Sequence, residues 1–242
     1  MTMPTTLVTG GSSASGIAVA RALAAAGHAV YTVGSDDVRI KAAALEAGGG
    51  VTPLVCDLAS LDSVRELADT LRDLGVAQVD GVIHLVGGWR SAQGVEDQSD
   101  EDWDSLEEGA ITTLRNVSRV FYGQLEASPQ GRLAMVSSTS VTSPTAGIAS
   151  YVAAKAAAEA WTLAVADGFR NAQSANTENP VEQHSAAVIF VVKSLVDETL
   201  RREHPERRFP GYTDVEELAA AAVGLFEEPA ANLNGQRLLL AK

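Results

Sequence analysis

Cysteine is nearly absent from the sequence, since Cys56 is the only one among 242 residues. A single thiol excludes a disulfide within the chain and fits a cytoplasmic protein, with Cys56 expected as a small buried apolar residue. Histidine is scarce too. The four histidines, His28, His84, His184 and His204, are scattered along the chain and show none of the spacings typical of a metal site, so we expect no bound metal.

Basic residues and long apolar runs are also lacking. Lys and Arg number 18 against 31 Asp and Glu, which gives a formal net charge of −13. This charge disfavours nucleic acid and anionic membranes as partners. No uncharged apolar run reaches the roughly 18 residues of a membrane span, and residues 1–7 lack the basic segment and apolar stretch of a signal peptide. We therefore expect neither a membrane nor a nucleic acid as a partner.

What the sequence does contain is a regular alternation of short β-type segments and longer helical segments. The expected strands are residues 6–9, 29–33, 51–55, 79–86, 132–137, 186–192 and 237–240. The expected helices are residues 17–26, 38–47, 60–74, 99–125, 150–169 and 214–226, with Ser60 and Ser99 as caps. The alternation predicts an α/β fold in one domain, residues 1–242: a doubly wound parallel sheet of six or seven strands flanked by helices.

A glycine-rich turn, residues 9–16, lies between the first expected strand and the first expected helix. Strand, glycine turn and helix in this order are typical of a nucleotide-binding site. The backbone N–H groups of such a turn and the positive end of the helix can hold a pyrophosphate. The sequence therefore predicts a bound nucleotide at this edge of the sheet.

Tyr151 and Lys155 stand four residues apart in an expected helix, so they lie on one face of it. The Lys155 ammonium is expected to favour the phenolate of Tyr151 and to lower its pKa, which makes Tyr151 a candidate proton donor or acceptor near neutral pH. Ser138 follows directly after the apolar run 132–137. A solvated Tyr–Lys pair is the alternative that this spacing alone leaves open.

Together these segments resemble the short-chain dehydrogenase/reductase family over nearly the whole chain. The turn at residues 9–16 is similar to the family's TGxxxGxG. Ser138, Tyr151 and Lys155 match its Ser…YxxxK set, with the usual 13-residue step from serine to tyrosine. Asp57 matches the acid that faces the adenine ring. The resemblance implies a Rossmann-like fold in which Ser138 bonds the substrate oxygen, Tyr151 passes the proton and Lys155 holds the ribose.

The resemblance also implies NAD(P)(H) as the cofactor. The residues that it places around the cofactor are Gly10, Ser12, Ser13, Ala14, Ser15, Gly16, Ser35, Asp57, Leu58, Gly87, Tyr151 and Lys155. The choice between NAD and NADP stays open. Gly34 stands where an acid would select NAD, and Ser35 stands where an arginine would select NADP. Arg39 can reach a phosphate there, but Asp36 and Asp37 oppose it.

Several positions depart from the family pattern. Ala14 replaces the middle glycine of the turn, which a negative φ at this residue would accommodate. Ala110 replaces the asparagine that completes the family's catalytic tetrad, so Thr112, Thr113 and water become candidates for the proton route. Lys-Ser at residues 193–194 replaces the Pro-Gly pair after the sixth strand.

The segment 86–89 reads Val-Gly-Gly-Trp and is similar to a motif of dihydropteridine reductases. Trp89 is a candidate substrate residue, either as a wall of the substrate site or as an aromatic packed within its loop. His84 stands where the family has the first asparagine of NNAG. We expect His84 to be a hydrogen-bonded residue at a strand end rather than a base.

The implied function is hydride transfer between NAD(P) and a small carbonyl, alcohol or pteridine-like substrate. The departures suggest two alternatives: a catalytically weak nucleotide-binding sensor, or a structural protein of this fold. Family members usually pair through the helices at residues 101–125 and 150–169, so we expect a homodimer or homotetramer. The charged segment 194–212, which contains two prolines, is expected to be a mobile substrate lid.

Overall fold

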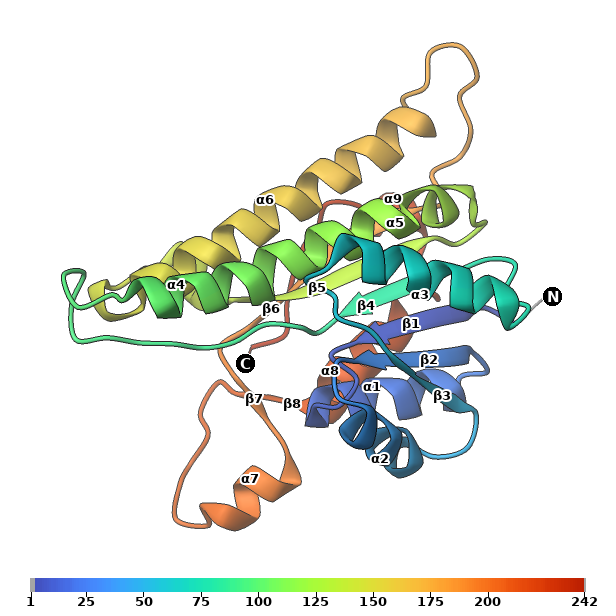
Figure 1. Cartoon of the computed structure of the whole chain (residues 1–242). Coiled ribbons are helices and arrows are strands. Elements are labelled where there is room, and N and C mark those ends of the chain that lie inside the picture. The colour runs from blue at the N-terminus through green and yellow to red at the C-terminus, as the bar shows by residue number, and fades with distance from the viewer. Residues whose placement is uncertain (1–2, 242) are drawn as a thin grey trace.

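A seven-stranded parallel sheet forms the centre of the protein in the computed structural model, which describes residues 3–241. Its strands are β1 (Thr5–Thr9), β2 (Ala29–Gly34), β3 (Val51–Val55), β4 (Gly81–His84), β5 (Arg132–Ser138), β6 (Ala186–Val192) and β9 (Arg237–Leu239). They lie in the order β3-β2-β1-β4-β5-β6-β9 (Figure 1). The expected doubly wound α/β fold is confirmed. Residues 1, 2 and 242 of the expected domain lie outside the described residues.

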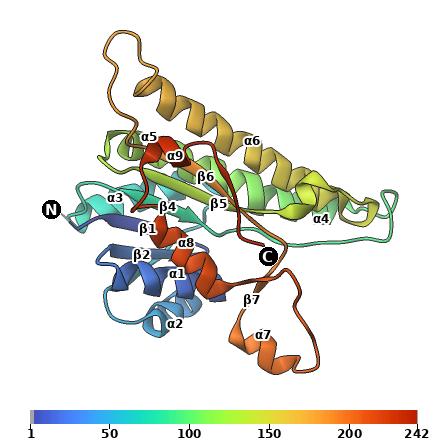
Figure 2. The ribbon, with the colours of Figure 1, turned by 180° about the vertical axis from the view of Figure 1, so that it is seen from behind.

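Helices cover both faces of this sheet. The main ones are α1 (Ala14–Ala25), α2 (Asp37–Ala47), α3 (Leu61–Asp73), α4 (Asp100–Glu107), α5 (Thr113–Ala127), α6 (Ala149–Ala172) and α8 (Val215–Gly224). Helix α1 packs against α2 and α8 on one face, while α5 packs against α3 and α6 on the other. Figure 1 and the view from behind in Figure 2 both show these two layers with the sheet between them.

The core is divided between the two faces because neighbouring side chains of a strand point to opposite sides. Leu7 of β1 belongs to the cluster packed under α3, α5 and α6, and the next residue, Val8, belongs to the cluster under α1 and α8. All seven residues of β6 are buried. Strands covered on both faces are apolar throughout, which explains why the sequence shows these strands as continuous apolar runs.

Hydroxyl and carboxylate side chains cap several of the helices. Ser60 and Ser99 accept hydrogen bonds from the backbone N–H groups of Ser63 and Asp102 at 3.2 and 3.1 Å. Both expected caps are therefore confirmed. The helix expected at residues 99–125 is interrupted by a π-helical turn, Glu108–Thr112, between α4 and α5. A turn of this kind is frequent at functional sites, and here it faces the carboxyl edge of the sheet through Gly109.

The segment 194–212 leaves the sheet after β6 and lies beside α1 (Figure 1). It contains the strand β7 (Leu195–Val196), which pairs with β8 (Thr213–Asp214), and the short helix α7 (Glu198–Glu203). The sequence did not predict these elements. A further short helix, α9 (Ala230–Leu233), precedes β9.

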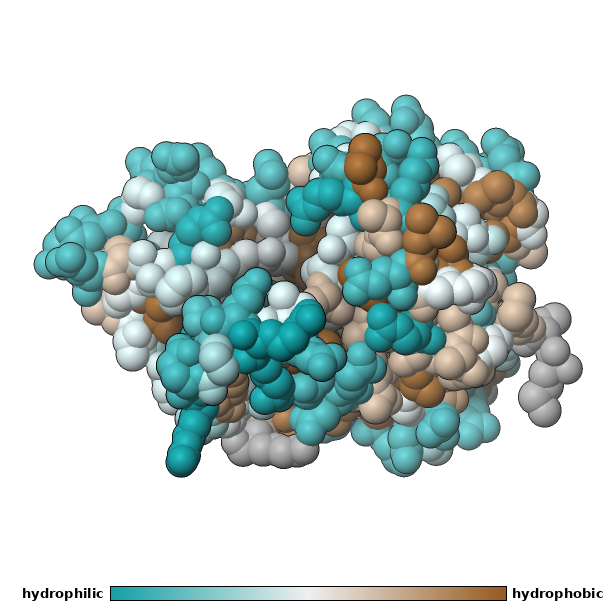
Figure 3. Space-filling view, turned by 90° about the horizontal axis from the view of Figure 1, so that it is seen from below, coloured by the Kyte–Doolittle hydropathy of each residue, from teal (hydrophilic) through white to brown (hydrophobic). Residues whose placement is uncertain are grey.

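The surface seen from below is mainly hydrophilic, with hydrophobic residues in several separate groups (Figure 3). This pattern agrees with the abundance of charged residues. Within residues 3–241, none of the helices is both long enough and apolar enough to cross a membrane.

Candidate active site

Ser138 and Tyr151 meet at the carboxyl edge of the sheet. Ser138 is the last residue of β5 and pairs with Val192 at the end of β6, while Tyr151 lies in the first turn of α6. The side chain of Ser138 lies close enough to the Tyr151 phenol to favour a lower pKa of that group. Its Oγ accepts the backbone N–H of Ser140 at 3.1 Å. The Ser140 bond helps to hold the Ser138 hydroxyl beside Tyr151.

The pKa of Tyr151 is raised above its ordinary value because the ring is buried, and the nearby Ser138 side chain acts in the opposite direction. The expectation that Lys155 lowers this pKa is therefore wrong. Burial removes water from the phenolate, which disfavours the charged form. The Lys155 ammonium meanwhile donates to the backbone carbonyl of Val136 at 2.9 Å.

Lys155 lies deep in the site, with 7% of its surface exposed. Its Nζ is 3.0 Å from the position that a Cβ on Gly87 would occupy, so Gly87 leaves room for the ammonium. Burial lowers the pKa of Lys155 to about 8, although the charge of Glu159 opposes this shift. The ammonium and the neutral amine of Lys155 are thus close in free energy near the upper end of the physiological pH range.

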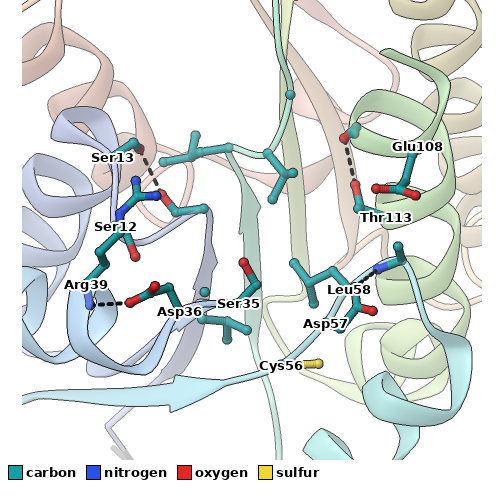
Figure 4. Close-up of a pocket in the computed structure, with 18 residues that line it drawn as sticks. Ser12, Ser13, Ser35, Asp36, Arg39, Cys56, Asp57, Leu58, Glu108 and Thr113 are labelled. Atoms are coloured by element: carbon teal, nitrogen blue, oxygen red, sulfur yellow. Dashed lines mark hydrogen bonds between the residues drawn. The ribbon is translucent and has the colours of Figure 1, made fainter. Parts of the chain in front are cut away.

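A cavity of about 330 Å³ opens at the carboxyl ends of β1, β2 and β4. Seven of the expected cofactor residues line it: Gly10, Ser12, Ser13, Ser35, Asp57, Leu58 and Gly87. Figure 4 shows Ser12, Asp36 and Arg39 on one side of the cavity. Asp57, Glu108 and Thr113 lie on the opposite side. The structure therefore brings together residues from distant parts of the chain.

The other expected cofactor residues are not among those that line this cavity: Ala14, Ser15, Gly16, Tyr151 and Lys155. Ala14 and Ser15 line a neighbouring hollow between α1 and the segment 194–212. A Cβ on Gly16 would stand 2.5 Å from the carbonyl oxygen of Gly10, so Gly16 allows the turn to pack tightly. Ala14 begins α1, and no described residue other than glycine has a positive φ. The methyl of Ala14 is accommodated, as the sequence required.

The cavity wall also contains residues that the sequence did not single out. Glu108 and Gly109 reach it from the π-helical turn. Only the three-dimensional arrangement could have revealed them, because they are about 50 residues from Asp57 in the chain. Cys56 lies in the wall as well, and burial raises the pKa of its thiol to about 11, so it is a neutral buried residue as expected.

Ala110 occupies the position of the missing tetrad asparagine. It is 4% exposed and packs with Leu106 and Ala154 in an apolar cluster that Tyr151 also contacts. The hydroxyls of the two candidate replacements are bonded elsewhere: Thr112 to Glu107 at 2.8 Å, and Thr113 to the carbonyl of Gly109 at 2.8 Å. The methyl group of Ala110 therefore stands beside Tyr151 where the family pattern has an amide side chain.

His84 ends β4 beneath the π-helical turn and is 2% exposed. Its Nδ1 lies 2.8 Å from the hydroxyl of Thr9, and its Nε2 lies 3.2 Å from the hydroxyl of Thr113. Since Thr113 donates its proton to Gly109, Nε2 donates to Thr113 and Nδ1 accepts from Thr9. Burial and the nearby charge of Lys155 lower the pKa of His84 to about 3. His84 is thus a neutral, fully bonded strand-end residue, as expected.

Trp89 lies in the loop that follows β4 and is 61% exposed. It is therefore not packed within its loop, which removes one of the two expected alternatives. The same loop is tied to the start of α6 by Gln98, whose side chain donates to the carbonyl of Gly147 at 3.3 Å and accepts from the backbone N–H of Ser150 at 3.1 Å. These bonds hold the loop next to Tyr151.

A comparison with known families identifies the family of this chain. A family model described as short chain dehydrogenase matches residues 4–174 of the chain. The chain belongs to this family. It is an NAD(P)-dependent short-chain dehydrogenase/reductase, and NAD(P)(H) is its cofactor.

Curated members of the short-chain dehydrogenase family are similar over nearly the full length. The D-beta-hydroxybutyrate dehydrogenase of Cupriavidus necator is 28% identical over 249 residues, which cover 96% of this chain and 93% of the relative. The acetoacetyl-CoA reductase of Shinella zoogloeoides is 26% identical, with 96% and 94% covered. Among solved structures, the 3-ketoacyl-(acyl-carrier-protein) reductase from Brucella melitensis complexed with NADH has a TM-score of 0.81 at 20% identity, covering 98% of this chain and 96% of that chain.

The residues of this short-chain dehydrogenase fit the cofactor. Gly34, Gly87 and Gly109 line the cavity without a side chain, so its floor at the sheet edge stays open. A Cβ on Gly34 would stand 2.8 Å from the Ser12 hydroxyl and would narrow the cavity. The amino-terminal end of α1 lies at the same edge, where a helix favours negative charge. Ser12 adds a hydroxyl group to the wall, whereas the Ser13 hydroxyl donates to the carbonyl of Gly10 at 2.8 Å and caps α1.

Proposed function

We propose that the protein transfers a hydride between NAD(P) and a small carbonyl or alcohol substrate, with Ser138, Tyr151 and Lys155 as catalytic residues. The observation that carries this proposal is the convergence of these three side chains at the end of β5, with the Lys155 ammonium next to Gly87, which lines the nucleotide cavity. When bound, the nicotinamide supplies or accepts the hydride.

Each of the three side chains has a role that its surroundings support. The Ser138 oxygen accepts from the backbone N–H of Ser140 and keeps its own proton, which Ser138 can donate to the substrate oxygen. Tyr151 is protonated at neutral pH, as a tyrosine with an ordinary or raised pKa is, so it can donate a proton to the oxygen of a carbonyl that is being reduced. Lys155 would hold the nicotinamide ribose, because its ammonium lies next to Gly87, which lines the cavity.

For the substrate, the names of the relatives favour 3-hydroxy and 3-keto acyl compounds. A pteridine-like substrate is the second candidate because of the Val-Gly-Gly-Trp segment. In either case the exposed Trp89 would form a wall of the substrate site. We further propose that the chain works as a single cytoplasmic domain, with residues 194–212 closing over the substrate.

The test is a screen of carbonyls and alcohols with both cofactors, followed through the absorbance of the reduced nicotinamide. On any substrate found, Tyr151→Phe should lower turnover by at least the ~10²–10⁴ typical of a lost acid–base group, while cofactor affinity changes little. Tyr122→Phe is the matched control, since the ring of Tyr122 stacks on Phe169 in the core. Lys155→Ala should weaken both cofactor binding and turnover. Near wild-type turnover by Tyr151→Phe would refute the catalytic assignment.

The sensor alternative rests on the apolar contact at Ala110 and on the Lys-Ser pair at residues 193–194. It takes the place of the enzyme proposal if the wild type binds a nicotinamide cofactor tightly and assembles differently with it, yet turns over nothing in the screen. The proximity of Ser138 to Tyr151 favours the enzyme, because a sensor needs no such pair.

A further inference from the structure

Glu159 is a buried carboxylate that the reaction itself does not use. It lies one turn after Lys155 on α6 and is 7% exposed. Its Oε1 accepts a hydrogen bond from the Ser137 hydroxyl at 2.5 Å. Arg237 of β9 donates to both oxygens, from Nε to Oε2 at 2.9 Å and from Nη2 to Oε1 at 3.1 Å. A buried carboxylate is costly unless it is bonded in this way.

The bond from Ser137 to Glu159 belongs to a larger pattern that joins α6 to β5, while the two bonds from Arg237 join α6 to β9. Tyr151, Lys155 and Glu159 follow one another at four-residue steps, so they share one face of the helix. Each contacts a different one of the last three residues of β5: Tyr151 meets Ser138, Lys155 meets the carbonyl of residue 136, and Glu159 meets residue 137. Glu159 thus fixes the helix on the strand that carries the catalytic serine.

We propose that Glu159 is a positioning residue for Lys155: held by Ser137 and Arg237, it anchors α6 on β5 and keeps the lysine side chain charged where the cofactor binds. Arg237 limits this effect because its own charge offsets that of the carboxylate. This inference rests on the proposed role of Lys155 in holding the cofactor.

The charges around Lys155 explain why such a residue is useful. On α6, Tyr151 is neutral because its pKa is raised, and Glu159 is the carboxylate that stabilises the ammonium. On β4, His84 is neutral because its pKa is about 3. On β9, the positive charge of Arg237 is paired with Glu159, with 2.9 Å between Nε and Oε2. Among these charged groups, Glu159 is therefore the one that opposes the fall in the pKa of Lys155 caused by burial.

The test is a direct titration of the Lys155 amino group by NMR with labelled lysine. The chain has four lysines, Lys41, Lys155, Lys193 and Lys242, so the spectrum is simple, and Lys155→Arg assigns the signal. Glu159→Gln keeps the shape and an acceptor for Ser137 but removes the charge, so the pKa of Lys155 should fall by about one unit. Arg237→Gln leaves the carboxylate uncompensated, so the pKa should rise.

Two opposite shifts separate this role from a merely structural one. Damage to packing would move the Lys155 signal in the same direction in both variants, which would overturn the proposal, as would the absence of a shift. Ser137→Ala is the matched control, because it removes a bond to Glu159 without changing a charge and should shift the signal much less. If Glu159→Gln fails to fold, the pKa of Lys155 in Arg237→Gln decides the question by itself.

Cofactor titration over the same pH range then connects the charge to function. The loss of cofactor affinity at high pH should begin at a lower pH in Glu159→Gln than in the wild type, and at a higher pH in Arg237→Gln. If the NMR titrations shift but the pH at which affinity is lost does not, Glu159 does not act through the cofactor contact and the proposal is overturned. If the wild type binds neither NAD nor NADP, the proposed function fails instead, so the two failures are distinct.

Discussion

Lowering the pH from 7 to 5 should destabilise the protein through His84. In the folded chain its ring is buried between Thr9 and Thr113, and its pKa is about 3 because burial and Lys155 disfavour the imidazolium. In the unfolded chain the pKa is near 6.5. Between these two values the unfolded chain binds a proton that the folded chain does not, so the free energy of unfolding falls as the pH drops below about 6.5.

The size of this effect follows from the two pKa values. From pH 7 to pH 5 the loss attributable to His84 is about 2 kcal/mol, and it continues to grow until the pH reaches the folded pKa of about 3. A typical protein has an unfolding free energy of roughly 5–15 kcal/mol. One buried histidine thus accounts for a measurable share of the acid sensitivity.

Urea unfolding at pH 7 and pH 5 measures this difference. His84→Asn should be less stable than the wild type at pH 7, because it loses packing, but its loss between pH 7 and pH 5 should be smaller by about 2 kcal/mol. His28, whose pKa burial also lowers, contributes equally to both proteins and cancels. Equal pH dependence in His84→Asn and the wild type would refute the reasoning.

Three further outcomes are expected. Gly10→Ala should lower the melting temperature more than Gly27→Ala: both have positive φ, 75° and 89°, but only at Gly10 would the new Cβ meet backbone, at 2.9 Å from the carbonyl carbon of Leu85. Sedimentation should show a dimer or tetramer, and Ala160→Arg, on the exposed side of α6, should favour the monomer; a wild type that is monomeric at micromolar concentration contradicts this. Hydrogen exchange should be faster in residues 194–212 than in β4 without ligand, and equal protection would contradict the proposed lid.

The architecture could be predicted because its signals are local. Continuous apolar runs mark strands covered on both faces, and β6 spans the same residues, Ala186–Val192, that the sequence predicted. The π-helical turn at Glu108–Thr112 could not be predicted, since its side chains fit a regular helix equally well. Helix α7 was missed because it is short and stands in a charged segment with nearby prolines.

The structure brings many of the expected site residues to one edge of the sheet, but the sequence did not predict their electrostatics. The spacing of Tyr151 and Lys155 places them on one helix face, but it does not show how deeply each is buried. Burial is what raises the pKa of Tyr151, against the expectation. The contact of Glu159 with Arg237 was invisible in the sequence because 78 residues separate the two.

Strand β9 is the last strand of the sheet in chain order, and this has a consequence for biosynthesis. Arg237 follows Lys155 by about 80 residues, so at roughly 5–20 residues per second the ribosome adds it about 4–16 s later. During that interval the nascent chain already contains Tyr151, Lys155 and Glu159, but it lacks the cation that neutralises Glu159. The charge balance around the lysine is therefore completed only after Arg237 has been added.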